Sequence, residues 1–204
     1  MVIKHSMKPL TFEKLDGISE KTLAIHHDKL YAGYVKKSAE IGEALSALRS
    51  SGEATGNATY SQFRALKDAE TFAVNGVYLH EWYFEGLGGD GDAGKAPELS
   101  AALNDKWGSV EDGLKYFSEA GMAARGWSVL CWDIKVGKLK HYNSDAHNQG
   151  VVWGCIPIIV LDVYEHAYFI DFGSDRKAYI EAFWKNLDWE QAEKLYLQAK
   201  EISL

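Results

Sequence analysis

The sequence predicts an α+β fold: an N-terminal antiparallel helical hairpin, followed by a C-terminal domain with a small antiparallel sheet of about three strands flanked by helices. Two long stripes of apolar residues at helical spacing come first, and three short runs rich in β-branched and aromatic residues come later. Between them the glycine-rich segment 86–97, GLGGDGDAGKAP, interrupts both patterns. We place the domain boundary there, so that residues 1–92 form the first domain and residues 93–204 the second.

The first helix is predicted to begin after Ser19, because serine commonly caps helix N-termini. Its apolar stripe runs from Leu23 to Leu48 at helical spacing. The small polar segment 50–59, SSGEATGNAT, predicts a loop, and a second apolar stripe from Phe63 to Phe84 predicts the second helix. Two long helices joined by a short loop favour an antiparallel hairpin.

The C-terminal domain is predicted to mix helices with a sheet. Ser109 followed by Asp112 resembles a capping box and predicts a helix over 109–120. Two closing helices are predicted from about Asp175 and Asp188, since aspartate is a frequent N-cap residue. Strands are predicted at 127–133, 138–142 and 156–161, with a turn at Gly137 joining the first two.

Composition excludes several classes of protein. Of the 204 residues, 47% are hydrophobic and 25% are charged, the balance of a soluble globular protein. The net charge of −7 argues against a general nucleic-acid-binding protein, which carries a basic face. The longest apolar run, 151–161, is interrupted by Gly154 and Pro157 and is too short to cross a bilayer. We therefore expect neither nucleic acid nor a membrane as a partner.

The two cysteines and the N-terminus bear on the cellular compartment. Cys131 and Cys155 are isolated and lack a CxxC spacing, which favours structural thiols in a reducing compartment over a disulfide framework. The first residues, MVIKHSMKPLTF, contain no apolar signal core, so export is not indicated. The cytoplasm is the expected location.

Three histidines and an aspartate are candidate metal ligands. His26 and His80 lie on the apolar stripes of the two long helices, where a histidine is usually a hydrogen-bonded core residue. Asp162 and His166 follow a predicted strand within the segment DVYEHAY. Imidazole with carboxylate is a ligand set for iron or manganese rather than calcium. The spacing between these residues is too long for a short metal motif, so only a fold could bring them together.

Several segments, in the same order along the chain, are similar to motifs of the iron/manganese superoxide dismutase family. DVYEHAY (162–168) resembles the family's D-x-W-E-H-A-Y signature, and HHDKLYAGYV (26–35) resembles its first-helix segment. LHEWYF (79–84) is similar to its N-H-x-x-F-[YW] segment, and GWSVL (126–130) to its G-W-x-W-L strand. Arg176 and Tyr179 stand where the family has R-P-x-Y, and FWKN (183–186) resembles its closing helix. The resemblance covers nearly the whole chain.

The resemblance implies a metal site shared between the two domains, each of which supplies two ligands. One iron or manganese ion per chain would be held, with a solvent molecule completing five-coordination, by His26, His80, Asp162 and His166. Tyr34 corresponds to the tyrosine at the mouth of the substrate funnel, and Trp127 and Phe84 to aromatic residues that wall the pocket. Glu165 and Tyr168 would reach across a dimer interface towards the partner's site. A homodimer is expected, with a tetramer left open.

The chain departs from the family at several positions. Leu30 and Tyr31 stand where the family usually carries histidines, the first of which pairs with the gateway tyrosine. The usual proton relay and part of the dimer bridge are therefore in question. Tyr164 replaces a tryptophan and adds a hydroxyl that needs a partner.

The residue that would hydrogen-bond the metal-bound solvent is open between two candidates. Gly76 stands where many iron enzymes of the family carry a glutamine, so the outer-sphere residue is expected from the segment 144–150. Within it we favour His147 over Gln149. The choice between iron, manganese and use of either metal stays open.

The implied function is disproportionation of superoxide to dioxygen and hydrogen peroxide. Arg176 is the favoured local attractor of the anionic substrate, and Lys29 is a weaker candidate. The alternative is a non-enzymatic metal-binding protein that keeps the fold with an impaired proton relay. An oxygenase with two histidines and one carboxylate is disfavoured by the fourth ligand, His80.

Overall fold

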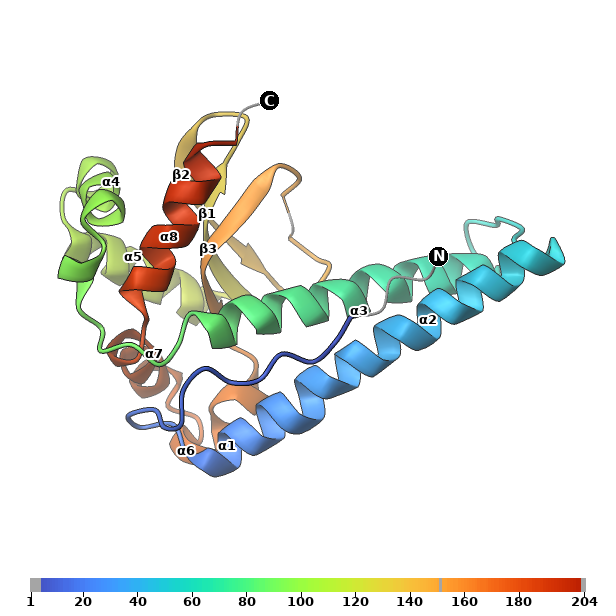
Figure 1. Cartoon of the computed structure of the whole chain (residues 1–204), viewed down its shortest axis with the longest axis horizontal. Helices are drawn as coiled ribbons and strands as arrows, with labels where there is room; N and C mark the ends of the chain where they lie inside the picture. The colour runs from blue at the N-terminus through green and yellow to red at the C-terminus, as the bar shows by residue number, and fades with distance from the viewer. Residues whose placement is uncertain (1–4, 151, 203–204) are drawn as a thin grey trace.

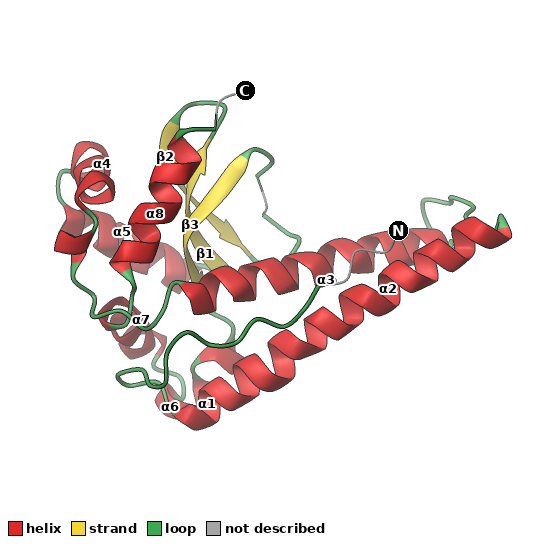
Figure 2. Cartoon of the chain, viewed as in Figure 1, coloured by secondary structure: helices red, strands yellow, loops and turns green. Residues whose placement is uncertain are grey.

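The computed structural model describes residues 5–150 and 152–202. Figure 1 shows a long helical hairpin that extends to one side of a body made of helices and a sheet. In Figure 2 the strands all lie within that body, in the C-terminal half of the chain. The α+β class predicted from the sequence is confirmed. The division at residue 92 stays a prediction.

The first helical segment is interrupted by a wider turn. Ser19 caps α1 (Glu20–Ile25), and its side chain accepts a hydrogen bond from the Thr22 amide, as predicted. The chain continues through a π-helical turn (His26–Tyr31) into α2 (Ala32–Ser51), which ends at Gly52 with a φ of 77°. A π turn is often found at functional sites, and periodicity did not predict it.

α3 (Gln62–Glu85) runs antiparallel beside α2, and the Ser61 side chain caps it. The predicted second helix is thus confirmed to within one residue at each end. The predicted loop begins later than expected, because residues 50 and 51 are still helical.

One helix of the body was not predicted. α4 (Pro97–Trp107) starts with proline in its first turn and buries Leu99 and Leu103, one helical turn apart. The amides of Glu98 and Leu99 donate to the Glu193 carboxylate, at 2.9 and 2.8 Å. α5 (Val110–Ala123) follows the predicted capping residue, Ser109.

The three strands form one antiparallel sheet in the order β2-β1-β3. They are β1 (Trp127–Asp133), β2 (Lys138–Ser144) and β3 (Cys155–Asp162), each within two residues of its predicted bounds. Gly137, with a φ of 62°, lies in the turn between β1 and β2. The register pairs Trp127 with Asp162. The sheet therefore brings a predicted wall residue beside a predicted metal ligand.

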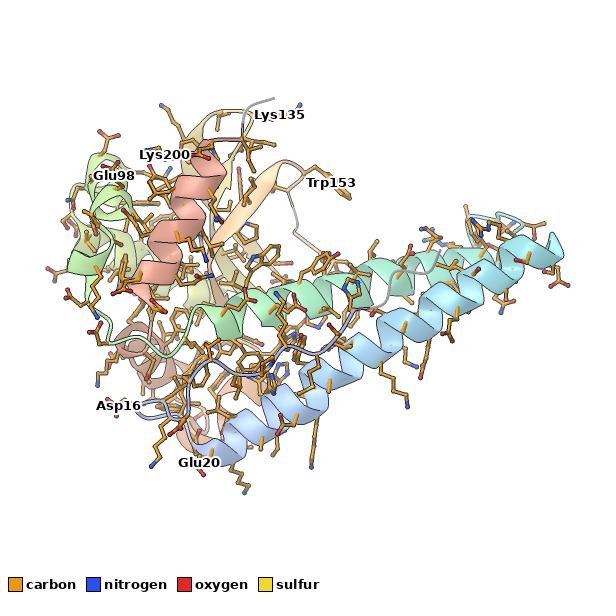
Figure 3. The ribbon with its side chains drawn as sticks, in the orientation of Figure 1. Asp16, Glu20, Glu98, Lys135, Trp153 and Lys200 are labelled. Atoms are coloured by element: carbon orange, nitrogen blue, oxygen red, sulfur yellow. The ribbon has the colours of Figure 1, made fainter. Side chains whose placement is uncertain are left out.

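Short helices and two longer ones complete the body. These are η2 (Ala93–Lys95), η3 (Glu165–Ala167), α6 (Phe169–Phe172), α7 (Arg176–Lys185) and α8 (Trp189–Lys200). Asp175 and Asp188 cap α7 and α8 with their side chains, as predicted. Lys200 and Glu98, labelled in Figure 3, form an ion pair of 3.7 Å between α8 and α4. In the described part of the chain, no helix combines the length and apolar character needed to traverse a bilayer.

Candidate metal centre

The four predicted ligands come together from four different elements. His26 begins the π turn, His80 lies in α3, Asp162 ends β3 and His166 lies in η3. Their candidate ligand atoms all lie within 4.8 Å of one another. His26, His80 and Asp162 are almost completely buried, and His166 is 26% exposed. Residues far apart in the sequence thus form one compact donor set.

The distances point to one coordinating atom on each residue. Asp162 Oδ2 is 3.0 Å from His26 Nε2, 3.2 Å from His166 Nε2 and 3.8 Å from His80 Nε2. Asp162 Oδ1 instead accepts a hydrogen bond from the Tyr164 amide at 2.9 Å. Oδ2 is therefore the oxygen that faces the three imidazoles.

His80 gives the clearest sign that this donor set suits a metal ion. Its Nδ1 donates to the Gly76 carbonyl at 2.6 Å, so its Nε2 carries a free lone pair. Among the described residues, this Nε2 is the buried side-chain nitrogen or oxygen that has no hydrogen-bond partner. An orphaned buried acceptor is costly unless a ligand satisfies it. Three imidazoles and one carboxylate fit a first-row metal such as iron or manganese.

The electrostatics favour the protonation states that a metal needs. Burial lowers the pKa of His26, and lowers that of His80 to about 3, so both imidazoles are neutral. Burial alone would raise the pKa of Asp162, but His166 and His26 outweigh it and hold the pKa well below its usual range. Burial lowers the pKa of His166 and the Asp162 carboxylate raises it, with a net upward shift. A bound cation would replace this internal pairing, since metal binding requires deprotonated ligands.

Aromatic residues surround the four ligands. The Phe84 ring lies 4.9 Å from His26, and the Tyr164 ring stacks on His166 at 5.2 Å and 15°. Trp127 is fully buried and meets His80 edge-on at 5.1 Å. These rings exclude water from most of the donor set and orient its imidazoles.

His147 lies in this aromatic wall, and its protonation can be derived. The Trp127 indole donates to His147 Nδ1 at 2.9 Å, and because an indole nitrogen can only donate, Nδ1 is the acceptor and Nε2 carries the proton. Burial lowers the pKa of His147 to about 4, which keeps the ring neutral. Its ring lies 4.6 Å from Tyr34 and 5.7 Å from His80. Gln149, by contrast, is exposed.

The loop that carries His147 is held from both sides. The Asn148 side chain donates to the Thr71 hydroxyl on α3 at 2.9 Å. The Ser144 hydroxyl lies within hydrogen-bond distance of the carbonyl oxygens of Ala146 and Gln149 and can donate its proton to one of them at a time. Gly150 has a φ of 109°, and a Cβ there would lie 2.4 Å from a backbone oxygen, so only glycine fits.

A groove leads to Tyr34 from outside. It has a volume of about 1030 Å³ and lies between α2, α3 and the 146–149 loop. Lys29, Leu30 and Tyr34 line one side, and Phe72 lines the other. The Phe72 ring is 4.5 Å from the ring of His147. The groove therefore ends beside Tyr34 and Phe72, whose rings both pack against His147.

Comparison with known proteins agrees with this centre. The model of the C-terminal domain of iron/manganese superoxide dismutases matches residues 95–195. The iron superoxide dismutase of Aquifex pyrophilus is 38% identical over 96% of this chain and 91% of its own length. The manganese superoxide dismutase of Haloarcula marismortui is 33% identical over 92% of this chain and 90% of its own.

The chain belongs to the iron/manganese superoxide dismutase family. Manganese superoxide dismutase 2 of Haloferax volcanii, 34% identical, is matched over 98% of this chain and 99% of its own length. Relatives named for iron and for manganese are about equally similar, so similarity does not choose the metal.

Departures from the family pattern have visible consequences here. Leu30 lines the groove one helical turn before Tyr34, and the Tyr34 hydroxyl forms no hydrogen bond with any described residue. Tyr31 is buried, and its hydroxyl donates to Glu81 at 2.9 Å rather than to Tyr34. A Cβ on Gly76 would lie 2.8 Å from the Tyr34 ring, so the Tyr34 ring occupies the space a glutamine would need.

Two of the remaining predicted site residues, Tyr168 and Arg176, contact each other. Glu165 is exposed, whereas Tyr168 is 4% exposed and its hydroxyl accepts from Arg176 Nε at 3.2 Å. Arg176 also donates to the Ala124 carbonyl at 2.7 Å. Arg176 thus forms its hydrogen bonds within its own chain. Lys29 and Lys37 line the groove, and Lys37 is paired with Glu40.

Two buried tyrosines support the centre and were not predicted to do so. The Tyr179 hydroxyl donates to the Asp162 carbonyl at 2.7 Å, and the Tyr83 hydroxyl lies 3.1 Å from that of Tyr179. These bonds fix the end of β3 that carries the carboxylate ligand. Both tyrosines lie in segments that resemble family motifs, but those motifs did not indicate a contact with Asp162.

Proposed function

We propose that this chain is a superoxide dismutase that converts two superoxide anions and two protons into dioxygen and hydrogen peroxide. The observation that carries the proposal is the convergence of three imidazoles and one carboxylate on one point, where the buried His80 Nε2 has no hydrogen-bond partner among the described residues. Family membership makes the same assignment.

His26, His80, Asp162 and His166 would hold one iron or manganese ion, whose trivalent and divalent states would supply the one-electron chemistry that disproportionation of superoxide needs. The protein supplies three imidazoles and a single negative carboxylate, so a centre that held a trivalent ion would be positive and would attract an anion. Trp127, Phe84 and Tyr164 keep the donor set dry, which strengthens that attraction.

Peroxide formation consumes protons, and two side chains beside the ligands hold them. His147 carries a proton on Nε2, as the Trp127 hydrogen bond requires. Burial, Tyr164 and Asp162 raise the pKa of Tyr34 to about 12, so its phenol stays protonated at neutral pH. We assign His147 as the outer-sphere residue in preference to Gln149, because only His147 is buried among the ligands.

Assembly and location are further parts of the proposal. We infer a homodimer through the exposed residues Glu165, Phe169 and Ile170, since the last two are apolar and 55% and 42% exposed. Sedimentation gives its mass, and a larger mass would indicate a tetramer. A cytoplasmic location is supported by the free thiols of Cys131 and Cys155.

The deciding experiment reconstitutes the same apoprotein separately with iron and with manganese, and measures bound metal and superoxide disproportionation in each. Activity with one metal at full occupancy would establish the enzyme and its cofactor. Comparable activity with both would show that either metal serves. Full occupancy without activity from either would contradict the proposal and favour the non-enzymatic metal-binding protein.

A further inference from the structure

The N-terminal segment, residues 5–12, lies along α3 and reaches the π turn (Figure 1). Lys8 Nζ is 2.6 Å from Glu85 Oε1 and 3.2 Å from Glu81 Oε2. The Lys8 carbonyl oxygen lies 2.8 Å from His27 Nε2. The segment is therefore fastened to both helical elements that carry the N-terminal metal ligands.

The Tyr31 hydroxyl lies where these contacts meet. It accepts a hydrogen bond from the Lys8 amide at 3.0 Å and donates one to Glu81 Oε1 at 2.9 Å. Tyr31 is 1% exposed and Glu81 is 15% exposed at its side chain, so water competes poorly for these bonds. Two partners fix the end of the phenol ring and, through it, the orientation of the whole side chain.

The Tyr31 ring lies beside the metal ligand His80. The two rings are within 18° of parallel, with centroids 6.2 Å apart. The hydrogen bond from His80 Nδ1 to Gly76 restrains one edge of the imidazole, but a single bond leaves its tilt free. The rings of Trp127, Tyr34 and Tyr31, with centroids 5.1, 5.3 and 6.2 Å from that of His80, supply contacts that limit this tilt.

We propose that Tyr31 is a positioning residue: its doubly hydrogen-bonded hydroxyl holds the ring against His80 and couples the N-terminal segment to retention of the metal. The inference rests on the proposed metal site but not on turnover. Residues that orient metal ligands in this way typically change metal affinity about 10- to 100-fold when they are replaced.

The test is Tyr31→Phe, which keeps the ring and removes the hydroxyl. Release of Mn²⁺ from the loaded protein into excess chelator is expected to become about tenfold faster, with the far-UV circular dichroism unchanged. Tyr196→Phe makes the same chemical change at a buried tyrosine of α8 and is expected to release metal at the wild-type rate. Release from Tyr31→Phe within about twofold of wild type would overturn the proposal.

A second set of variants tests the same hydrogen bond should Tyr31→Phe fail to fold. Glu81→Ala removes the acceptor and is expected to release Mn²⁺ about tenfold faster, whereas Glu81→Gln keeps an oxygen acceptor and restores slow release. Lys8→Ala removes the ammonium group but keeps the amide that donates to Tyr31, so it controls for the lost ion pairs. Equal release from the Ala and Gln variants of Glu81 would refute the role.

Metal release is measured without superoxide. A wild-type protein that retains Mn²⁺ but shows no disproportionation when fully loaded with either manganese or iron would contradict the proposed function and leave the role of Tyr31 intact. If every variant releases Mn²⁺ slowly while the wild-type enzyme is active, the role of Tyr31 would be contradicted and the proposed function would stand.

Discussion

Leu30 is the residue at which this chain departs most directly from the family pattern. Its side chain lines the groove four residues before Tyr34, on the same helical face. Position 30 therefore offers Tyr34 no hydrogen-bonding side chain, and the imidazoles beside the Tyr34 ring are those of His147 and His80. We expect metal binding to be unaffected by this change, because the hydrogen bonds of the four ligand residues do not involve position 30.

The first prediction concerns proton delivery. Leu30→His restores a group that can bond to Tyr34, so turnover under proton-limited conditions is expected to rise severalfold, because general acid groups contribute about 10²–10⁴-fold. Turnover is measured against pH and in deuterium oxide, with bound metal quantified. Leu30→Met, which keeps an apolar side chain, is the matched control. Unchanged pH and isotope dependence in Leu30→His would contradict the idea that position 30 limits proton delivery.

His141 is a residue whose burial links stability to pH. Its ring packs 4.4 Å from Phe117, and its Nε2 lies 3.0 Å from the Ser128 hydroxyl. Burial lowers its pKa from 6.5 to about 4. Between these two pH values the unfolded chain binds a proton that the folded protein does not, so the free energy of unfolding falls as pH falls.

The second prediction follows from that linkage. The His141 contribution is constant above pH 6.5 and is lost between pH 6.5 and about 4, to a total of about 3 kcal/mol. His141→Gln keeps a hydrogen-bonding side chain that does not titrate, so its unfolding free energy is expected to fall less over this range. Urea unfolding of both proteins at pH 7 and pH 4.5, at equal metal occupancy, measures the difference. Parallel losses in the two proteins would show that His141 is not responsible.

At the scale of elements, α4 depends on a carboxylate from another helix. The first amides of a helix have no partner within the helix. In α4 the amides of Glu98 and Leu99 donate to both oxygens of Glu193 on α8, at 2.9 and 2.8 Å. The same contact therefore caps α4 and joins it to α8. The ion pair between Lys200 and Glu98 adds a second link between the two helices.

The third prediction is that Glu193→Ala lowers the unfolding free energy by about 1–2 kcal/mol, the usual cost of losing a helix cap. Glu190→Ala is the control, since Glu190 lies in the same helix, is 72% exposed and only approaches Lys95 at 3.9 Å. Its expected effect is below about 0.5 kcal/mol. Denaturant midpoints compare the two variants, and equal losses would argue against a cap by Glu193.

Across the whole molecule, charge opposes the substrate that the site is proposed to use. The net charge of −7 repels an anion, so local cations must attract it at short range. The hairpin places Lys29 on the groove. Arg176, the residue favoured from the sequence, is bonded to Tyr168 and the Ala124 carbonyl.

The fourth prediction separates these two cations. If Arg176 attracts superoxide, Arg176→Ala lowers kcat/KM most at low ionic strength, because salt screens charges beyond about 10 Å. Lys29→Ala is measured in the same way, and a similar loss of kcat/KM at low ionic strength is expected if Lys29 attracts superoxide. A rate and salt dependence unchanged in Arg176→Ala would contradict its role in attraction, and the same result for Lys29→Ala would contradict the role of Lys29.

Local patterns along the chain were enough to predict most elements. Helical periodicity and capping residues such as Ser19, Asp175 and Asp188 located the ends of helices, because caps act within one turn. α4 was not predicted, because its cap comes from Glu193, far along the chain. The π turn was also not predicted, because the apolar pattern was read with the α-helical period.

The sequence by itself determined which side chains were available for a metal: three histidines and one aspartate, with the motifs that resemble a family. Only the tertiary structure decided that these four meet within 4.8 Å, that His147 rather than Gln149 is buried beside them, and that Tyr31 bonds to Glu81. The physical reason is the distance along the chain over which each kind of interaction acts. Propensity and capping act between near neighbours, whereas a metal centre needs a π turn, a helix and a strand end to pack against one another.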